Sequence, residues 1–275
     1  MDEWQLLGGA VISQGWFYHS GITLFGLLAG SFLNVVVYRI PLIIARAERI
    51  TTHRFNLSFP SSHCPACQHT LRCWHNVPLL SWLVLKGRCH YCQSKIPGFY
   101  PFNEGLCALG FLALSFMLST PAALCAALIL FWFLLALSLI DLATSLLPDS
   151  LTLQLLWAGL LVNSFLGNVA LQDAVYGAVA GYLSLWFLYW GVKIVTGKEG
   201  MGYGDFKLLA ALGVWVGWQM LPHLCILAAL TGMVFALVSK RRNHMTKQIP
   251  FGPSLASAGL IVYISQQSDS VWLTF

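Results

Sequence analysis

The chain has 275 residues, of which 57% are hydrophobic and 9% charged, and its formal net charge is +5. Because an ordinary soluble domain carries roughly 25% charged residues, this composition excludes a soluble globular protein and predicts an all-α polytopic membrane protein. The basic residues lie in loops beside apolar segments and not along a basic helix, so they indicate membrane orientation and not nucleic-acid binding.

The first apolar segment, residues 15–38, is long enough to cross the hydrocarbon core, which takes about 20 residues in a helix. Three small residues lie within it: Gly26, Gly30 and Ser31. Small side chains let helices approach each other closely, so we expect a second helix to pack here. Residues 1–14 contain no Lys or Arg and so lack the positive region of a signal peptide. We therefore expect residues 1–38 to remain as an N-terminal anchor.

A polar insert follows at residues 39–101, with eight of the fifteen basic residues. It is too short to form a large core and needs a cross-link or a metal. Two Cys-x-x-Cys pairs separated by 21 residues match the ligand spacing of a four-cysteine zinc ribbon: Cys64, Cys67, Cys89 and Cys92. Two disulfides are the alternative, and a cytoplasmic position, where thiols stay reduced, favours the metal. Four cysteines fill the tetrahedral shell, so the predicted zinc is structural.

Seven more apolar segments complete a prediction of about eight transmembrane helices: 103–119, 121–140, 150–167, 173–195, 206–218, 221–239 and 251–267. The segment 206–218 is too short to cross unaided, and we expect it to be partly re-entrant. If the N-terminus lies outside, every Lys and Arg falls in an inner loop or within a turn of one, which places the insert in the cytoplasm. Residues 102–275 would then form a membrane-embedded helical bundle.

Two carboxylates stand at the inner ends of different apolar segments, Asp141 and Asp205. Burying an ionisable group beside lipid is costly, so each is a functional candidate. Two carboxylates that share a site cannot both ionise cheaply, so one can act as acid and the other as base in peptide hydrolysis. The N–H groups around Gly202 and Gly204 could bind the tetrahedral intermediate. Asp149 follows Pro148 directly and suits a helix N-cap.

Several longer sequence stretches, taken together, are specific enough to indicate a protein family. They are residues 26–41 (GLLAGSFLNVVVYRIP), residues 75–82 (HNVPLLSW) between the cysteine pairs, Ile140-Asp141 with residues 146–149 (LLPD), residues 196–209 (TGKEGMGYGDFKLL) and residues 250–253 (PFGP). With these stretches the chain resembles the bacterial type IV prepilin peptidases, which are bifunctional leader peptidases and N-methyltransferases of the GxGD aspartic protease class.

The resemblance implies an intramembrane aspartic endopeptidase whose catalytic pair is Asp141 and Asp205. Its expected substrates are type IV prepilins and type II secretion pseudopilins, cut after a glycine at the cytoplasmic face of the bacterial inner membrane. The family then methylates the new N-terminal residue with S-adenosylmethionine, and its zinc-type cysteines match the four above. Glu104 and Glu199 stand in segments that resemble the family and are candidates for binding substrate or methyl donor. An exposed ion pair with Lys198 is the alternative role for Glu199.

Other functions remain open from the sequence. The chain could be a peptidase without methyl transfer, or a polytopic transporter that uses Asp141 and Asp205 as an ion or proton relay. A membrane scaffold that presents the zinc ribbon to a partner is a third possibility. Loss of Cys64 would impair the scaffold, whereas loss of either aspartate would leave it unaffected.

Overall fold

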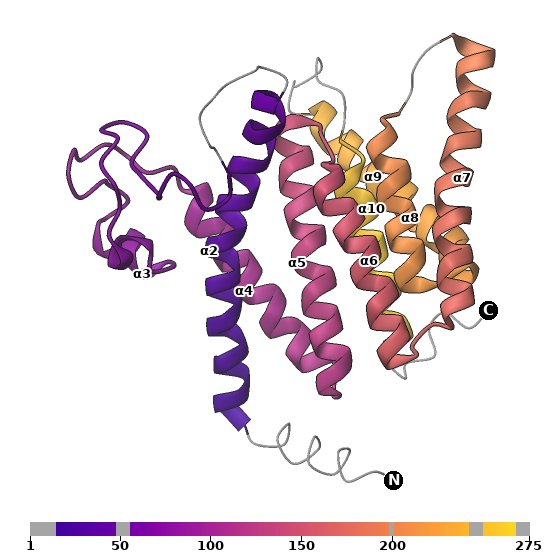
Figure 1. Ribbon diagram of the computed structural model, residues 1–275, viewed down its shortest axis with the longest axis horizontal. Coiled ribbons are helices and arrows are strands. Elements are labelled where there is room, and N and C mark those ends of the chain that lie inside the picture. Colours follow the sequence, from indigo (N-terminus) through magenta and orange to yellow (C-terminus); the bar gives the residue numbers. More distant parts are fainter. Residues whose placement is uncertain (1–14, 48–55, 198–200, 242–249, 268–275) are drawn as a thin grey trace. The chain divides into compact units, whose positions relative to one another are not determined.

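The computed structural model describes residues 15–47, 56–197, 201–241 and 250–267, and Figure 1 shows their arrangement. Secondary structure in these residues is helical, apart from two isolated β-bridges within the cysteine insert. Two compact units make up the chain, residues 1–124 and residues 125–275. The boundary between them falls near the start of α5 (Pro121–Thr144).

The first unit is built on the pair α2 (Gly15–Ala47) and α4 (Phe99–Met117). A Cβ atom on Gly26 would lie 2.8 Å from the Cα of Ala108, and one on Gly30 would lie 2.8 Å from the Cα of Glu104. Only glycine permits so close an approach of two helices. The prediction that a helix packs against the small residues of the first segment is confirmed.

Helix α2 continues beyond the predicted apolar segment, through Pro41 to Ala47. Proline lacks an N–H and usually kinks or ends a helix, but it does not forbid continuation. Near this end, the buried guanidinium of Arg39 donates hydrogen bonds to the carbonyls of Asn56 and Pro60, at 3.0 and 2.6 Å. The basic end of α2 is therefore joined to the start of the described part of the insert.

The insert between α2 and α4 contains two short helices, η1 (Cys73–Asn76) and α3 (Leu80–Val84). The rest of it is turns. The α3 helix ends in a tight turn in which Lys86 and Gly87 both have positive φ angles, 52° and 67°. Trp82 packs over this turn, since a Cβ atom on Gly87 would lie 2.9 Å from its indole ring.

The second unit has α8 (Tyr203–Val216) at its centre. The remaining helices are α5, α6 (Asp149–Leu166), α7 (Leu171–Thr196), η2 (Trp218–Met220), α9 (Leu221–Arg241) and α10 (Gly252–Gln267). Helix α8 packs against α6, α7 and α10, and from Asp205 to Val216 every residue except Lys207 is buried. A Cβ atom on Gly177 of α7 would clash with the carbonyl of Gly213, so these two helices touch through their backbones.

Helix α8 has 14 residues and is about 21 Å long at 1.5 Å per residue, less than the roughly 30 Å of a hydrocarbon core. Carbonyl groups at its buried C-terminal end need hydrogen-bond donors. Asn163 of α6 donates to the Val214 carbonyl at 2.7 Å, and Gln266 of α10 donates to the Val216 carbonyl at 3.0 Å. A short helix is thus accommodated inside the unit, in agreement with the short segment that the sequence predicts.

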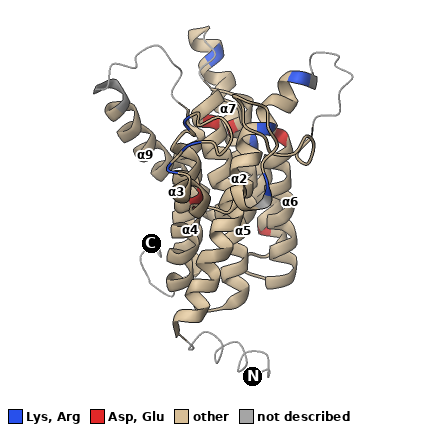
Figure 2. Cartoon of the chain, turned by 90° about the vertical axis from the view of Figure 1, so that its left-hand side faces the viewer, with Lys and Arg blue, Asp and Glu red and all other residues tan. Residues whose placement is uncertain are grey.

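Each of the eight predicted membrane segments coincides with a described helix. Four stretches are long and apolar enough to cross a membrane: Gly15–Arg46, Pro121–Thr144, Leu171–Thr196 and Trp218–Val238. The protein is therefore an all-helical membrane protein. Charge is concentrated at helix ends, with Lys193 in the last turn of α7 and Lys207 near the start of α8 (Figure 2).

Candidate active site

Asp141 lies three residues before the end of α5, in a helix that is otherwise almost wholly apolar. Its side chain is buried, with 5% of the residue surface exposed. The Oδ2 atom accepts a hydrogen bond of 2.9 Å from the backbone N–H of Gly252, the first residue of α10. A carboxylate at a helix N-terminus is stabilised by the unpaired N–H groups and by the helix dipole. The N-terminus of α10 therefore offsets the free-energy cost of burying the Asp141 carboxylate.

The position of Gly252 requires glycine. A Cβ atom there would lie 2.6 Å from the Oδ2 atom of Asp141 and 3.2 Å from Leu147. Real Cβ atoms do not approach an oxygen so closely, so any other residue would displace the carboxylate. Sequence reasoning did not assign Gly252 to the site, although it singled out the Pro-Phe-Gly-Pro stretch that contains it.

Asp205 lies in the first turn of α8 and is 8% exposed. Gly202 caps this helix in an extended conformation, φ −83° and ψ 149°. Gly204, one residue before Asp205, packs against the loop that follows α5, since a Cβ atom on it would lie 2.7 Å from the Cβ of Leu147. The glycines allow the start of α8 to sit directly on this loop.

Leu147 joins the two halves of the site because it contacts both Gly204 and Gly252. Through these contacts the loop after α5, the start of α8 and the start of α10 converge. The carboxyl groups of Asp141 and Asp205 are close enough to interact electrostatically. The structure therefore brings the two predicted aspartates together in one buried site, where two like charges repel strongly.

An ion pair lies beside this site. The Nζ atom of Lys207 donates to both carboxylate oxygens of Asp149, at 2.6 and 2.7 Å. Pro148 occupies the N-cap position of α6 and Asp149 is the first residue of the helix, so the N-cap role suggested by the sequence is wrong. The reason is the packing of α6 on α8, which places Lys207 opposite Asp149 although 58 residues separate them.

The four paired cysteines form a second cluster, in the first unit. Their sulfur atoms all lie within 4.8 Å of one another, and the Sγ atoms of Cys64 and Cys92 are 3.8 Å apart. Four sulfurs held tetrahedrally around zinc at about 2.3 Å are separated by about 3.8 Å, so the cluster fits this ion. A disulfide, with sulfurs about 2.05 Å apart, is excluded for this pair.

Both cysteine pairs have the same backbone form. After each pair the chain turns back, with Gln68 and Gln93 at φ angles of 57° and 58° and their N–H groups bonded to the carbonyls of Cys64 and Cys89. The N–H group of Cys67 points toward Cys64 and lowers the pKa of that thiol to about 6. A thiolate is the form that binds metal, so the turn prepares Cys64 for coordination.

Glu104, a candidate from the sequence, is engaged within the first unit. Its Oε2 atom accepts a hydrogen bond of 2.9 Å from the N–H of Leu79, just before α3. This contact holds the start of α3 beside α4, and the role of Glu104 in binding substrate or methyl donor stays a prediction. The other candidate, Glu199, lies outside the described residues.

Two family models match the chain. The bacterial peptidase A24 N-terminal domain matches residues 24–118, and the type IV leader peptidase family matches residues 128–237. The chain belongs to the type IV leader peptidase family. The two matched regions fall on either side of the boundary between the compact units.

Members of the family with high similarity include proteins named prepilin leader peptidase/N-methyltransferase. That of Aeromonas salmonicida strain A449 is 49% identical over 273 residues, which cover 94% of each chain. That of Aeromonas hydrophila is 49% identical with the same coverage, and that of Pseudomonas aeruginosa is 47% identical over 92% of each chain. No solved structure matches the chain.

Proposed function

We propose that the protein cleaves the leader peptides of type IV prepilins and type II secretion pseudopilins and then N-methylates the new N-terminal residue. The observation that carries the peptidase half is the convergence of Asp141 and Asp205 through Leu147 and Gly252. The similarity to prepilin leader peptidase/N-methyltransferases over 94% of the chain supports both activities.

In the proposed hydrolysis Asp141 and Asp205 hold one proton between them, since two adjacent carboxyl groups cannot both ionise cheaply. The ionised carboxylate takes a proton from water, and the oxygen of that water attacks the carbonyl carbon of the scissile bond. The protonated carboxyl donates its proton to the carbonyl oxygen. Proton transfer to the amide nitrogen then lets the C–N bond break, so each carboxyl acts once as acid and once as base.

The start of α8 contributes to this chemistry through its backbone. Helix N-termini present N–H groups toward a ligand, and we propose that those around Gly202 and Gly204 donate hydrogen bonds to the tetrahedral intermediate.

The proposed topology has eight membrane segments and a periplasmic N-terminus. It places Asp141 and Asp205 at the cytoplasmic face of the inner membrane, where they meet the basic leader while the apolar helix of the pilin lies in the bilayer. The charge pattern supports this orientation. Lys193 lies in the last turn of α7, and Lys207 lies two residues after Asp205 near the start of α8, so both basic residues are close to the connection between these helices.

We further propose three functional regions: the anchor at residues 1–38, the zinc insert at residues 39–101 and the peptidase bundle at residues 102–275. Zinc bound by the four cysteines would stabilise the insert, which has few buried apolar residues of its own. S-adenosylmethionine supplies an electrophilic methyl group for the amine that cleavage releases. Glu104 and Glu199 stay the candidates for binding this donor or the substrate.

The experiment that tests the function uses the purified protein in lipid nanodiscs, a candidate prepilin, and S-adenosylmethionine present or absent. Mass spectrometry of the pilin N-terminus should show loss of the leader in both cases and one added methyl group only with the donor. A mature pilin that never gains the methyl group would show that the protein is a peptidase without methyltransferase activity. A precursor that stays intact would contradict the proposal and favour a transporter or scaffold.

A further inference from the structure

An exposed apolar surface lies on the insert of the first unit. Residues 77–85 (VPLLSWLVL) contain no charged side chain and include α3. Leu80 and Leu83 are each 62% exposed and Val84 is 79% exposed. A cluster of large apolar side chains that are this exposed marks a surface that contacts a membrane, a ligand or another protein.

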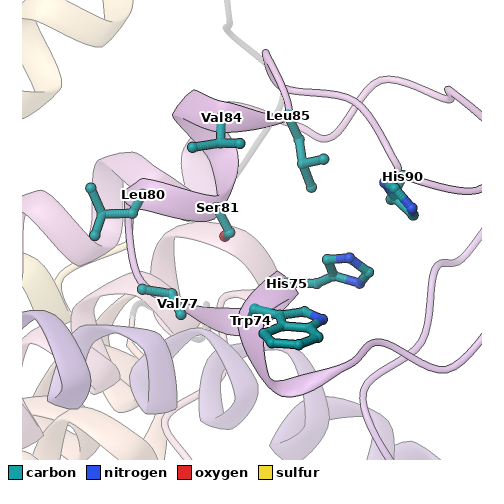
Figure 3. Close-up of a pocket in the computed structure, with 8 residues that line it drawn as sticks. All are labelled: Trp74, His75, Val77, Leu80, Ser81, Val84, Leu85 and His90. Atoms are coloured by element: carbon teal, nitrogen blue, oxygen red, sulfur yellow. The ribbon is translucent and has the colours of Figure 1, made fainter.

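Part of this surface lines an open cavity of about 460 Å³. Figure 3 shows the side chains around it. Leu80 and Val84 line it from α3, and Trp74 lines it from η1. Trp74 is itself 69% exposed. The lining is mostly apolar, but it also includes three polar side chains, those of His75, Ser81 and His90. Its exposed apolar part can contact a flexible hydrocarbon chain.

The depth of α3 along the helices identifies what this surface contacts. The hydrogen bond from Leu79 to Glu104 fixes the start of α3 beside α4, and Glu104 packs against Gly30 of α2. Gly30 lies nine residues before Arg39, which is about 14 Å along the helix, within the apolar segment of α2. The start of α3 is therefore level with the membrane-spanning part of α2 and does not lie beyond it.

Other apolar side chains of the same unit are exposed as well. Phe102, two residues before Glu104 on α4, is 65% exposed, as expected for a side chain that faces lipid.

The charges beside α3 fit a phospholipid surface. Lys86 and Arg88 follow the apolar run directly, at the turn that ends α3, and residues 56–98 contain no Asp or Glu. Basic residues beside an apolar segment are attracted to anionic headgroups, and Trp favours the interface between headgroups and acyl chains.

We propose that residues 77–85 insert α3 into the adjacent membrane leaflet, so that Leu80, Leu83 and Val84 contact acyl chains and Lys86 and Arg88 contact anionic headgroups. The zinc insert is then held flat against the bilayer and is not a freely soluble domain. An interfacial helix of this kind is buried about 5–10 Å below the headgroups. The proposal depends on the membrane position of α2 and not on the peptidase activity.

The test uses the full-length protein in nanodiscs that contain phosphatidylethanolamine and phosphatidylglycerol. A photo-reactive benzoylphenylalanine replaces Leu83 or Val84, and the control places it at Ser58, an exposed position of the insert outside the cysteine turns. After irradiation, mass spectrometry should find phospholipid adduct predominantly at Leu83 and Val84 and little at Ser58. Zinc content reports whether each variant is folded.

Three outcomes would overturn the proposal. Phospholipid adduct could be missing at Leu83 and Val84 in a zinc-loaded protein, or equally abundant at Ser58. Alternatively, the probes could react only with added prepilin, which would make this face a substrate-docking surface. None of these results requires the protein to be inactive as a peptidase, so the proposed function is tested separately.

Discussion

The backbone N–H of Gly252 donates a hydrogen bond of 2.9 Å to the carboxylate of Asp141, 111 residues earlier in the chain. This bond makes Asp141 the partner of a helix N-terminus, so the carboxylate and α10 hold each other in place. The position of one proposed catalytic group therefore depends on a backbone atom of a distant segment.

Substitution of Gly252 by Ala should lower the cleavage rate by about 10²-fold, because misplacing a reacting group by about 1 Å costs this much. The added Cβ atom would meet the Oδ2 atom of Asp141 at 2.6 Å and push it aside. Gly191→Ala is the matched control, since a Cβ atom there meets nothing within 4 Å. Steady-state cleavage of a prepilin by both variants checks the prediction. Equal rates would show that Asp141 tolerates the displacement.

The two glycines before Asp205 should differ in their tolerance of alanine. Gly204→Ala should strongly reduce cleavage because its Cβ atom would meet Leu147 at 2.7 Å. Gly202→Ala should retain most activity, since Gly202 has a negative φ angle and open space around it. Measured rates for the two variants side by side test this difference. An inactive Gly202→Ala with a normal Gly204→Ala would contradict the geometry of the loop.

The Asp149 and Lys207 pair should contribute little to stability. Its side chains are 59% and 33% exposed, and exposed ion pairs are worth about 0–1 kcal/mol. We expect a double-mutant cycle with Asp149→Asn and Lys207→Met to give a coupling energy in this range, measured from unfolding in detergent. A coupling of several kcal/mol would mean that the pair is buried in the working protein.

Zinc binding should weaken in acid, because protons compete with the metal for the cysteine thiolates. The N–H of Cys67 lowers the pKa of the Cys64 thiol to about 6, and bound zinc holds the thiolate below this pH as well, so zinc should be lost only below pH 6. Zinc content after dialysis at a series of pH values, measured by atomic emission, checks the prediction. Loss of zinc already at pH 7 would show that Cys64 is not held as a thiolate.

Replacement of Cys64 by Ser should abolish zinc binding and lower the yield of folded protein, since the insert would lose its main source of folding energy. Cys225→Ser, in α9 and outside the cluster, is the control and should leave zinc content unchanged. A zinc-free Cys64→Ser protein produced in normal yield would show that the metal is not needed for folding.

Local features of the sequence predict much of this structure. Apolar runs locate the helices because each must satisfy its own backbone hydrogen bonds in lipid. Cysteine spacing predicts the sulfur cluster because two short turns bring the thiols of each pair together. The packing at Gly26 and Gly30 follows from the small size of these residues alone.

Contacts between distant segments are not encoded in such patterns. Nothing near Asp141 in the sequence points to Gly252, and nothing near Asp149 points to Lys207, because both pairings arise only when α6, α8 and α10 pack together. The same holds for α3, whose apolar run appears in the sequence but whose depth depends on the bond between Leu79 and Glu104.

The most direct test of the catalytic pair replaces each aspartate by its isosteric amide, Asp141→Asn and Asp205→Asn. Each amide keeps the shape of the side chain but cannot transfer the proton that hydrolysis requires, so cleavage should fall by about 10³-fold or more. The measurement is the mass of the prepilin N-terminus after incubation with each variant, at equal protein yield and zinc content. An intact leader with both variants is the predicted result. Normal leader removal by either variant would contradict the account.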